Sequence, residues 1–533
     1  MRRVPVVCAI VLVPAVVAAV TGIVRNPTSD ADLVLPLVAV VVAVAVAAYA
    51  SVRRIRRAAT RTTPGGGTAD VVPLDELDRR SRRMLVETDD CVRTSREELG
   101  CAAALSGGET VRMYAEAVEF AAAELAQAFL IRQRLDDGEG EVRVLLEEVL
   151  TRCDAAGRRL DAEAAGFDQI RALERTAPEA LEHSETRFRE LTARVGEADG
   201  MLSGLRERYA LSAYLPVAGH DEEAKDRLVF AMVCLNRTRQ ALDGEGTGDA
   251  VVPLRAAETS VDQATLLLDG VTRLASVLAA AAAELPAALN AAEADLAEAR
   301  GRLDTETVRA DLRGRITHGE SVVAAVREET GEGAGVEGAQ DAREPYDPVD
   351  ALRRIEQMAA GLDRAQHRVP EGSRALARLQ RALLVARGTV GAASDQVTAH
   401  RGAVGCEART RLAEAERRLR AAENTETPPV PAPADALADA REAATLARRA
   451  RQLAERDVRA YGTPYAEGLW TGGAVLGGIL LDAPHRRGDR PGHPGDGGPA
   501  SYGGPRTRGR RAGGELFRST RPENPPPDGP GAP

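Results

Sequence analysis

Two long apolar runs stand at the beginning of the chain. Residues 4–24 and 33–52 carry no charged side chain, and each reaches the length of about 20 apolar residues that a helix needs to cross a bilayer. The polar residues 25–32 between them are few enough for a tight turn. This pattern predicts a transmembrane helical hairpin. The alternative is that residues 1–22 form a signal peptide, because arginines precede the apolar run and small residues end it.

A cluster of arginines follows the second apolar run. Its members are Arg53, Arg54, Arg56, Arg57 and Arg61. Basic residues beside a membrane span favour the cytoplasmic side. We therefore expect a cell-membrane protein with two spans and a cytoplasmic C-terminal body, or with a single span if a signal peptide is cleaved. The same arginines are placed to contact anionic lipid headgroups.

After a linker at residues 62–74, apolar positions recur every three or four residues, as on one face of an α-helix. One such stripe runs over residues 111–129 and the next over residues 142–160. The acidic, glycine-containing residues 136–141 between them are typical of a turn. We expect two antiparallel helices here, within a helical region that spans residues 75–329.

Two stretches have the 4-3 spacing of a coiled-coil heptad. The first seam has two rows, which are Val271, Leu278, Leu285, Ala292 and Ala299, and Ala275, Ala282, Leu289, Leu296 and Leu303. Pro286 lies inside it, so we expect a kink or a new helix start there. The second seam consists of Leu376, Leu383, Val390, Val397 and Val404 with Leu379, Ala386 and Ala393. Gly402 and Gly405 break its phase before the pattern resumes at Leu412.

Glycine- and proline-rich segments divide the rest of the chain. We expect a Gly-rich linker at residues 330–347, then a second helical region at 348–461 with a Pro-rich loop at 426–433. Gly, Pro and Arg dominate residues 462–533, which predicts a disordered tail. An apolar island at 468–481 is too short and too rich in Gly to predict a further span, so its contact with the membrane stays open.

The expected fold class is therefore mainly α. It comprises an N-terminal transmembrane hairpin at residues 1–61, an extended Ala-rich helical bundle or coiled-coil body, and the disordered tail. Aromatic residues make up only 3% of the chain, so small side chains must supply most of the core. The net charge of −10 argues against nucleic-acid binding along the whole chain. Six scattered cysteines without a Cys-x-x-Cys pair argue against a disulfide framework.

The sequence contains no recognisable pattern of a catalytic or metal site. Residues 333–338 spell a dinucleotide-binding motif, but they lie in the expected linker and not between a strand and a helix. Residues 220–223 contain a histidine and three acids, yet they stand where a helix is expected to begin, and acids there offset the helix dipole. We expect no enzymatic activity, catalytic residue, cofactor, metal or small-molecule substrate. Carboxylates facing one another inside a bundle would reopen that question.

Arginines of the tail are further candidates for binding. They outnumber the nearby acids and are interleaved with Gly and with Tyr502, which suits contacts with RNA, with anionic lipid or with the acidic body of the chain itself. The residues selected as possible contacts of an anionic partner are Arg53, Arg54, Arg56, Arg57, Arg506, Arg508, Arg510 and Arg511.

Five passages carry a family resemblance, namely residues 217–228, 266–275, 284–289, 401–412 and 503–514. They resemble the C-terminal helical half of actinobacterial membrane proteins that carry an extracytoplasmic TPM domain, and related membrane families of unknown function. The chain departs from that family at its N-terminus, where the turn at residues 25–32 stands in place of the outer domain. The resemblance implies an anchored helical module without an assigned activity, and it supplies no catalytic residues.

These patterns favour a membrane-anchored cytoplasmic scaffold or interaction protein that binds a protein partner or associates with itself through its heptad seams. The alternative is a module that binds anionic lipid or nucleic acid through the Arg/Gly-rich tail. The biological process, the partner and the oligomeric state stay open.

Overall fold

The computed structural model describes six stretches of the chain, which are residues 72–244, 250–303, 309–331, 345–424, 432–461 and 501–512. The predicted hairpin at residues 1–61 and the apolar island at 468–481 lie outside the described residues. The chain divides between Val72 and Pro73, and the helices described below belong to the second unit.

That unit is built from α-helices. The described residues contain no strand, and one isolated parallel bridge pairs Tyr209 with Tyr346. The expectation of a mainly α fold is confirmed.

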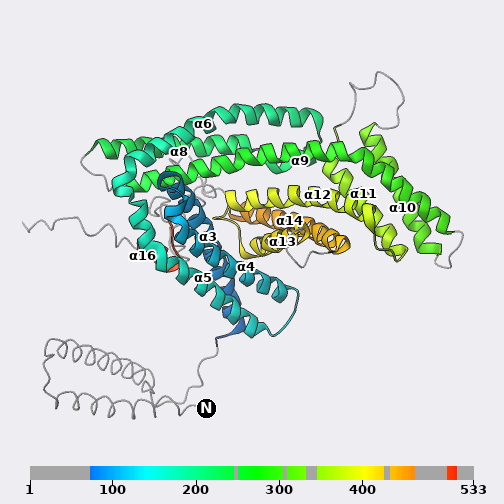
Figure 1. Cartoon of the computed structure of the whole chain (residues 1–533), viewed down its shortest axis with the longest axis horizontal. Helices are drawn as coiled ribbons and strands as arrows, with labels where there is room; N and C mark the ends of the chain where they lie inside the picture. The colour runs from blue at the N-terminus through cyan, green and yellow to red at the C-terminus, as the bar shows by residue number, and fades with distance from the viewer. Residues whose placement is uncertain are drawn as a thin grey trace, which may run out of the picture. The chain divides into compact units, whose positions relative to one another are not determined.

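Three helices come first and pack against one another, namely α3 (Leu74–Ser106), α4 (Gly108–Asp136) and α5 (Val142–Arg171) (Figure 1). Gly107 separates α3 from α4 with a φ of 82°, which glycine adopts without strain. Gly138 and Gly140 also have positive φ and connect α4 to α5. The prediction of a turn at residues 136–141 is confirmed.

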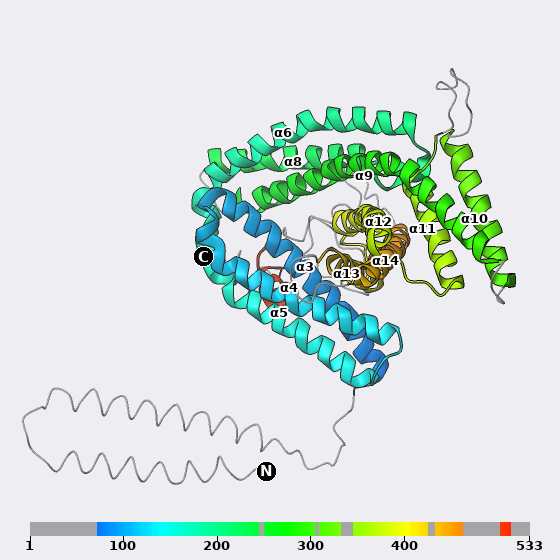
Figure 2. The ribbon, with the colours of Figure 1, turned by 45° about the vertical axis from the view of Figure 1, so that its right-hand side comes forward.

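The next long helices run side by side in both views (Figures 1 and 2), and they are α6 (Leu173–Arg208), α8 (His220–Asp243) and α9 (Val251–Leu303). The short α7 (Leu211–Tyr214) and the 3₁₀ turn η1 (Leu215–Val217) connect α6 to α8. Asp221, Glu222 and Glu223 occupy the first turn of α8. The interpretation of this segment as a helix start is confirmed.

The long helix α9 continues through Pro286, so the prediction of a new helix start there is wrong. A proline inside a helix removes one hydrogen bond and costs about 3 kcal/mol. Its neighbours Leu285 and Leu289 are both buried. Their packing holds the segment helical, because tertiary contacts override local propensity.

The remaining long helices are α10 (Arg309–Thr330), α11 (Pro348–Ala365), α12 (Gly372–Ala399), α13 (Cys406–Glu423) and α14 (Pro433–Tyr461) (Figure 2). The first three pack onto α9, and α13 and α14 pack onto α12 and onto each other. Gly405 directly precedes α13. The predicted interruption of the second seam at Gly402 and Gly405 therefore corresponds to the connection between α12 and α13.

The heptad seams are buried largely inside this unit. Every residue of the first row, from Val271 to Ala299, is buried. The beginning of that row shares a core with α6 and α8, and its end shares another with α10 to α14. The first seam therefore faces several helices of the same chain, as in a globular bundle, and not one long partner helix. In the second seam Leu376 is 52% exposed.

Within the described residues, α9 alone is long and apolar enough to cross a membrane by length and composition, and 39% of its most apolar window is buried. The central helix of a bundle meets the same criteria. This feature is therefore a weak indication of membrane association.

Residues 501–512 differ from the disorder predicted for the tail. They include the helix α16 (Pro505–Ala512), which packs against α3 and α5. The side chain of Tyr502 just before it is completely buried. The local Gly- and Pro-rich composition does not identify these distant partners.

Candidate functional site

A surface formed by α3, α4 and α5 holds residues 501–508. We call it the docking groove, and its main residues are Ser95, Tyr114, Gly157, Asp161 and Phe167. In Figure 1, α16 lies beside α5 at this surface. The groove thus receives a segment that is more than 300 residues away in sequence from every helix that forms it.

Tyr502 fills the aromatic part of the docking groove. Its ring stacks on Phe167 with centroids 4.2 Å apart and meets Tyr114 edge-on at 6.1 Å. Its hydroxyl donates to the backbone carbonyl oxygen of Tyr114 at 3.2 Å. Burial raises the pKa of Tyr502 above its ordinary value, so the hydroxyl remains a donor. Buried aromatic contacts of this kind add about 1 kcal/mol beyond the area that they bury.

Glycines allow the two backbones to approach. A Cβ on Gly504 would overlap the carbonyl oxygen of Gly157, and a Cβ on Gly157 would lie 2.9 Å from Cδ of Pro505. Gly503 has a φ of 134°, which other residues rarely adopt. The sequence Tyr-Gly-Gly-Pro therefore fits the groove through its backbone shape as well as through the tyrosine ring.

Polar contacts fix the segment along its length. The amide of Gly503 donates to Oγ of Ser95 at 3.2 Å, and the amide of Thr507 donates to Oδ1 of Asp161 at 2.9 Å. The second contact lies in the first turn of α16, where backbone amides have no partner within their own helix. Asp161 thus acts as a cap supplied by another helix.

The predicted anion contacts separate into three groups. Arg508 is only 8% exposed, and its Nη1 donates to Sγ of Cys91 at 3.4 Å. It therefore faces the protein in this structure, and its selection as a contact of an anionic partner stays a prediction. Arg506 keeps a side chain that is 71% exposed, 3.8 Å from Asp154. The side chains of Arg510 and Arg511, and all of Arg53, Arg54, Arg56 and Arg57, lie outside the described residues.

Cys91, which accepts the hydrogen bond from Arg508, is a buried thiol. Burial raises its pKa to about 11, and the nearby Arg508 opposes that shift only in part. The thiol therefore stays protonated at neutral pH and is not an activated nucleophile. The other described cysteines are also free and buried.

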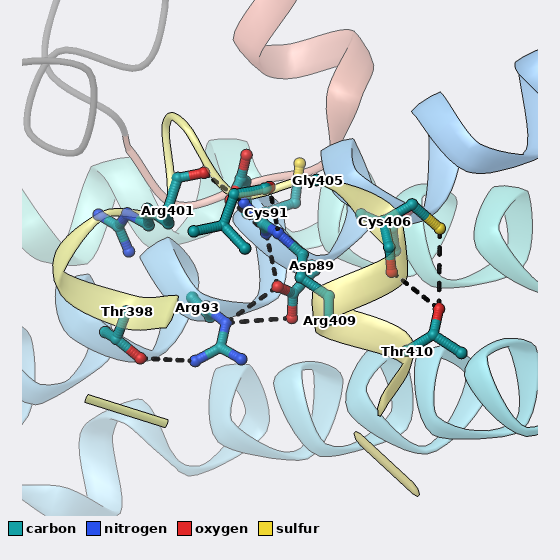
Figure 3. A network of polar contacts seen from close by, with 12 residues as sticks. Asp89, Cys91, Arg93, Thr398, Arg401, Gly405, Cys406, Arg409 and Thr410 are labelled. Carbon is teal, nitrogen blue, oxygen red and sulfur yellow. Dashed lines mark hydrogen bonds and ion pairs between the residues drawn. The ribbon is translucent and has the colours of Figure 1, made fainter. Parts of the chain in front are cut away.

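The opposite side of α3 is held by Arg409 of α13 (Figure 3). Its Nη1 donates to Oδ2 of Asp89 at 2.6 Å and to Oδ1 of Asp90 at 2.7 Å, and its Nη2 donates to the carbonyl oxygen of Arg401 at 2.5 Å. Burial disfavours the charge of Asp89, but the guanidiniums of Arg93 and Arg409 outweigh that effect. The pKa of Asp89 therefore lies below its ordinary value.

Two further arginines extend this network (Figure 3). Arg93 binds Asp89 through Nε and reaches Oγ1 of Thr398 at 2.9 Å. Arg401 forms a bidentate pair with Glu97 at 2.7 and 2.9 Å. The network thus connects α3 to the end of α12 and the start of α13. The network therefore positions α3, the helix that also carries Ser95 and Cys91 of the docking groove.

A second buried cluster brings carboxylates together between α3, α5, α6 and α9. Arg171 binds Glu258 and lies 3.5 Å from Glu98, while Arg187 binds Asp262 at 2.7 Å. Burial raises the pKa of Glu258 to about 7 and that of Asp262 to about 6.

Such facing carboxylates are the condition that would reopen the question of an enzyme. Here, however, guanidiniums occupy the space between them. Burial also raises the pKa of the neighbouring Cys101 thiol well above its ordinary value. In the part of the chain that the structure describes, no group of three or more His, Cys, Asp and Glu side chains is placed to hold a metal. The cluster fits an internal ionic contact between helices.

Sequence reasoning missed the docking groove and both arginine networks. One signal for the groove was present, since a lone tyrosine precedes two glycines and a proline that can start a helix. The tail passage 503–514 also belongs to the passages that carry the family resemblance. The buried arginines gave no such signal, because their spacing matches that of exposed ones.

The chain is similar to two proteins of Mycobacterium tuberculosis, the UPF0603 protein MT2410 of strain CDC 1551 / Oshkosh and the UPF0603 protein Rv2345 of strain ATCC 25618 / H37Rv. Each is 34% identical over 423 residues, and the match covers 77% of this chain and 62% of the relative's length. No family model and no solved structure matches the chain. The uncharacterised status of these relatives agrees with the expected resemblance to families of unknown function. Their relation to TPM-domain proteins stays a prediction.

Proposed function

We propose that this chain is a membrane-anchored helical scaffold whose docking groove binds a short peptide segment. The observation that carries the proposal is the complete burial of Tyr502 between Tyr114 and Phe167. A groove that recognises a ring, two backbone amides and a glycine pair is selective for one kind of segment. Scaffolds recruit their partners through sites of this kind.

The anchor in this proposal is the pair of apolar runs at residues 4–24 and 33–52. The arginines from Arg53 to Arg61 favour a cytoplasmic body, with one or two spans according to the fate of the first run. Protease accessibility of the body in intact and in opened membrane vesicles tests this part. Cleavage of the body from the outside of intact cells would contradict the cytoplasmic orientation.

Association with a partner uses surfaces other than the first seam, because that seam is largely buried within the chain. The docking groove is the best-defined alternative. In the described structure it holds the chain's own residues 501–508, and a partner with a similar Tyr-Gly-Gly-Pro segment would compete for it. Crosslinking in cells is expected to trap the chain with itself or with one defined partner. A chain that stays monomeric and without partners would contradict the scaffold.

The groove itself is tested with a labelled peptide of residues 499–512 and the full-length chain. The Tyr502→Ala variant weakens the internal segment, so we expect saturable peptide binding to this variant and little to the wild type. A peptide with Ala in place of Tyr502 is expected not to bind. Tyr461→Ala is the matched control, since Tyr461 is 41% exposed and lies outside the groove. Equal binding of both peptides would overturn the assignment of the groove.

A further inference from the structure

A second site lies between residues 315 and 448, where α10, α11, α12 and α14 enclose a cavity of about 560 Å³. Six arginines line it, together with His318 and a single carboxylate, Glu356. The arginines are Arg315, Arg353, Arg354, Arg364, Arg441 and Arg448. This excess of positive charge contrasts with the net charge of −10 for the whole chain.

The cavity combines these charges with an apolar lining. Val322 of α10, Met358 of α11 and Val385 of α12 contribute side chains to it. Gly361 leaves room beside Arg315, whose Nη1 would lie 3.5 Å from a Cβ at that glycine. A ligand that fits both properties has an anionic group joined to an apolar part.

Only some of the lining arginines are neutralised. Arg354 binds Glu329, and Arg353 donates through Nε to Asp350 at 3.0 Å. Arg441 donates to Oε2 of Glu356 at 2.9 Å. That carboxylate is shared, because its other oxygen accepts from Arg381, which lies behind the lining.

Two lining arginines have no carboxylate partner within the described residues. Arg448 donates to Oγ1 of Thr445 at 3.3 Å, and Arg364 donates to the carbonyl oxygen of Ala360 at 3.3 Å. Burial and the charge of Arg353 lower the pKa of Arg448, and Asp350 opposes them. In addition, Nε of Arg441 is buried without a hydrogen-bond partner. The cavity therefore has donors and positive charge that a bound anion would satisfy.

We propose that this cavity binds the phosphate group of a small ligand whose apolar part rests on the Val322, Met358 and Val385 side chains. Guanidinium groups match phosphate because two parallel N–H donors meet two oxygens of the anion. The phosphate belongs either to a soluble organic phosphate or to the headgroup of an anionic lipid. This inference is independent of the docking groove, and it assigns anion binding to the folded body instead of the arginine-rich tail.

The test uses the full-length chain in phosphatidylcholine nanodiscs and the fluorescent probe 1-naphthyl phosphate. We expect saturable binding that Arg448→Gln and Arg364→Gln each weaken about tenfold, the loss typical of one charge-assisted contact. Arg449→Gln is the matched control, because Arg449 is the exposed neighbour of Arg448 on α14 and does not line the cavity. Circular dichroism is expected to be the same for all three variants.

Unchanged affinity in both cavity variants would overturn the proposal, and so would equal binding of the uncharged 1-naphthol. Competition then identifies the source of the phosphate. Displacement of the probe by soluble pyrophosphate indicates a soluble ligand, and displacement by vesicles of phosphatidic acid in phosphatidylcholine indicates a lipid headgroup. Failure of both competitors would also overturn the assignment to phosphate.

Discussion

Arg409 binds Asp89 across 320 positions of the sequence, with its Nη1 2.6 Å from Oδ2 of the carboxylate. Both side chains are almost completely buried, at 1% and 7% exposure. A buried ion pair is costly to form but even more costly to break on one side, since the remaining charge then lacks compensation. This relationship therefore controls whether α3 and α13 stay together.

We expect Arg409→Met to lower the free energy of unfolding by roughly 3–5 kcal/mol, because it leaves Asp89 and Asp90 with fewer partners in the interior. Urea denaturation followed by circular dichroism measures the change. Arg420→Met is the control, because Arg420 is exposed on the same helix. Adding Asp89→Asn to Arg409→Met is expected to restore part of the loss. Equal stabilities of the Arg409 and Arg420 variants would contradict a structural role of the network.

Tyr502→Ala is expected to release residues 501–512 from the docking groove while the long helices stay folded. The ring loses its contacts with Phe167 and Tyr114, a change that typically costs about 3–5 kcal/mol for a buried aromatic residue. Limited trypsin digestion measures the release as faster cleavage after Arg506 and Arg508. Tyr502→Phe removes only the hydroxyl contact, so its effect is expected to be about 1 kcal/mol. Unchanged cleavage in Tyr502→Ala would mean that the ring does not hold the segment.

The helices and the docked segment differ in how much the sequence reveals of them. The stripes at residues 111–129 and 142–160 predicted α4 and α5, because apolar periodicity reflects which face of a helix is buried. Tyr502 has no such periodic neighbours. Its partners Tyr114 and Phe167 lie more than 300 residues away, so local composition predicted disorder where a long-range contact imposes order.

The arginines illustrate a second limit. Arg409 is 1% exposed in its side chain and Arg417, two turns later on α13, is 42% exposed, yet both stand in the same Arg-, Ala- and Glu-rich stretch. Charge alone predicts solvent for both. Only the pairing with Asp89 and Asp90 of α3 determines which one is buried. The Arg-lined cavity escaped prediction for the same reason, because its residues come from four separate helices.

Glu258 provides a test of pH dependence. Burial raises its pKa from about 4.5 to about 7, although Arg171 opposes the shift. The folded state then holds the proton more tightly than the unfolded state, so the stability contributed by this group is present below about pH 4.5 and is lost as the pH rises through about 7. Glu258→Gln mimics the protonated form. We expect Glu258→Gln to be as stable as the wild type below about pH 4.5 and more stable than the wild type above about pH 7.

Thermal unfolding of the wild type and of Glu258→Gln across this pH range measures the difference between their free energies of unfolding. We expect this difference to approach roughly 3 kcal/mol at the upper end of the pH range. Glu190→Gln removes an exposed carboxylate on α6 and is expected to leave the pH profile unchanged. A constant difference between Glu258→Gln and the wild type at all pH values would show that folding does not shift the pKa of Glu258.

Cys91 reports on the docked segment through its chemical reactivity. Burial raises the pKa of Cys91 and of Cys234 to about 11, so both thiols are expected to react slowly with iodoacetamide in the native wild type. Arg508 covers only Cys91, whereas Cys234 lies in the core between α6, α8 and α9. Tyr502→Ala is therefore expected to accelerate alkylation of Cys91 and to leave Cys234 slow, as measured by mass spectrometry of tryptic peptides. Acceleration at both cysteines would indicate general unfolding, and acceleration at neither would mean that the segment does not protect the thiol. Faster alkylation of Cys91 alone requires that residues 501–508 leave the docking groove together while the helices around Cys234 stay packed.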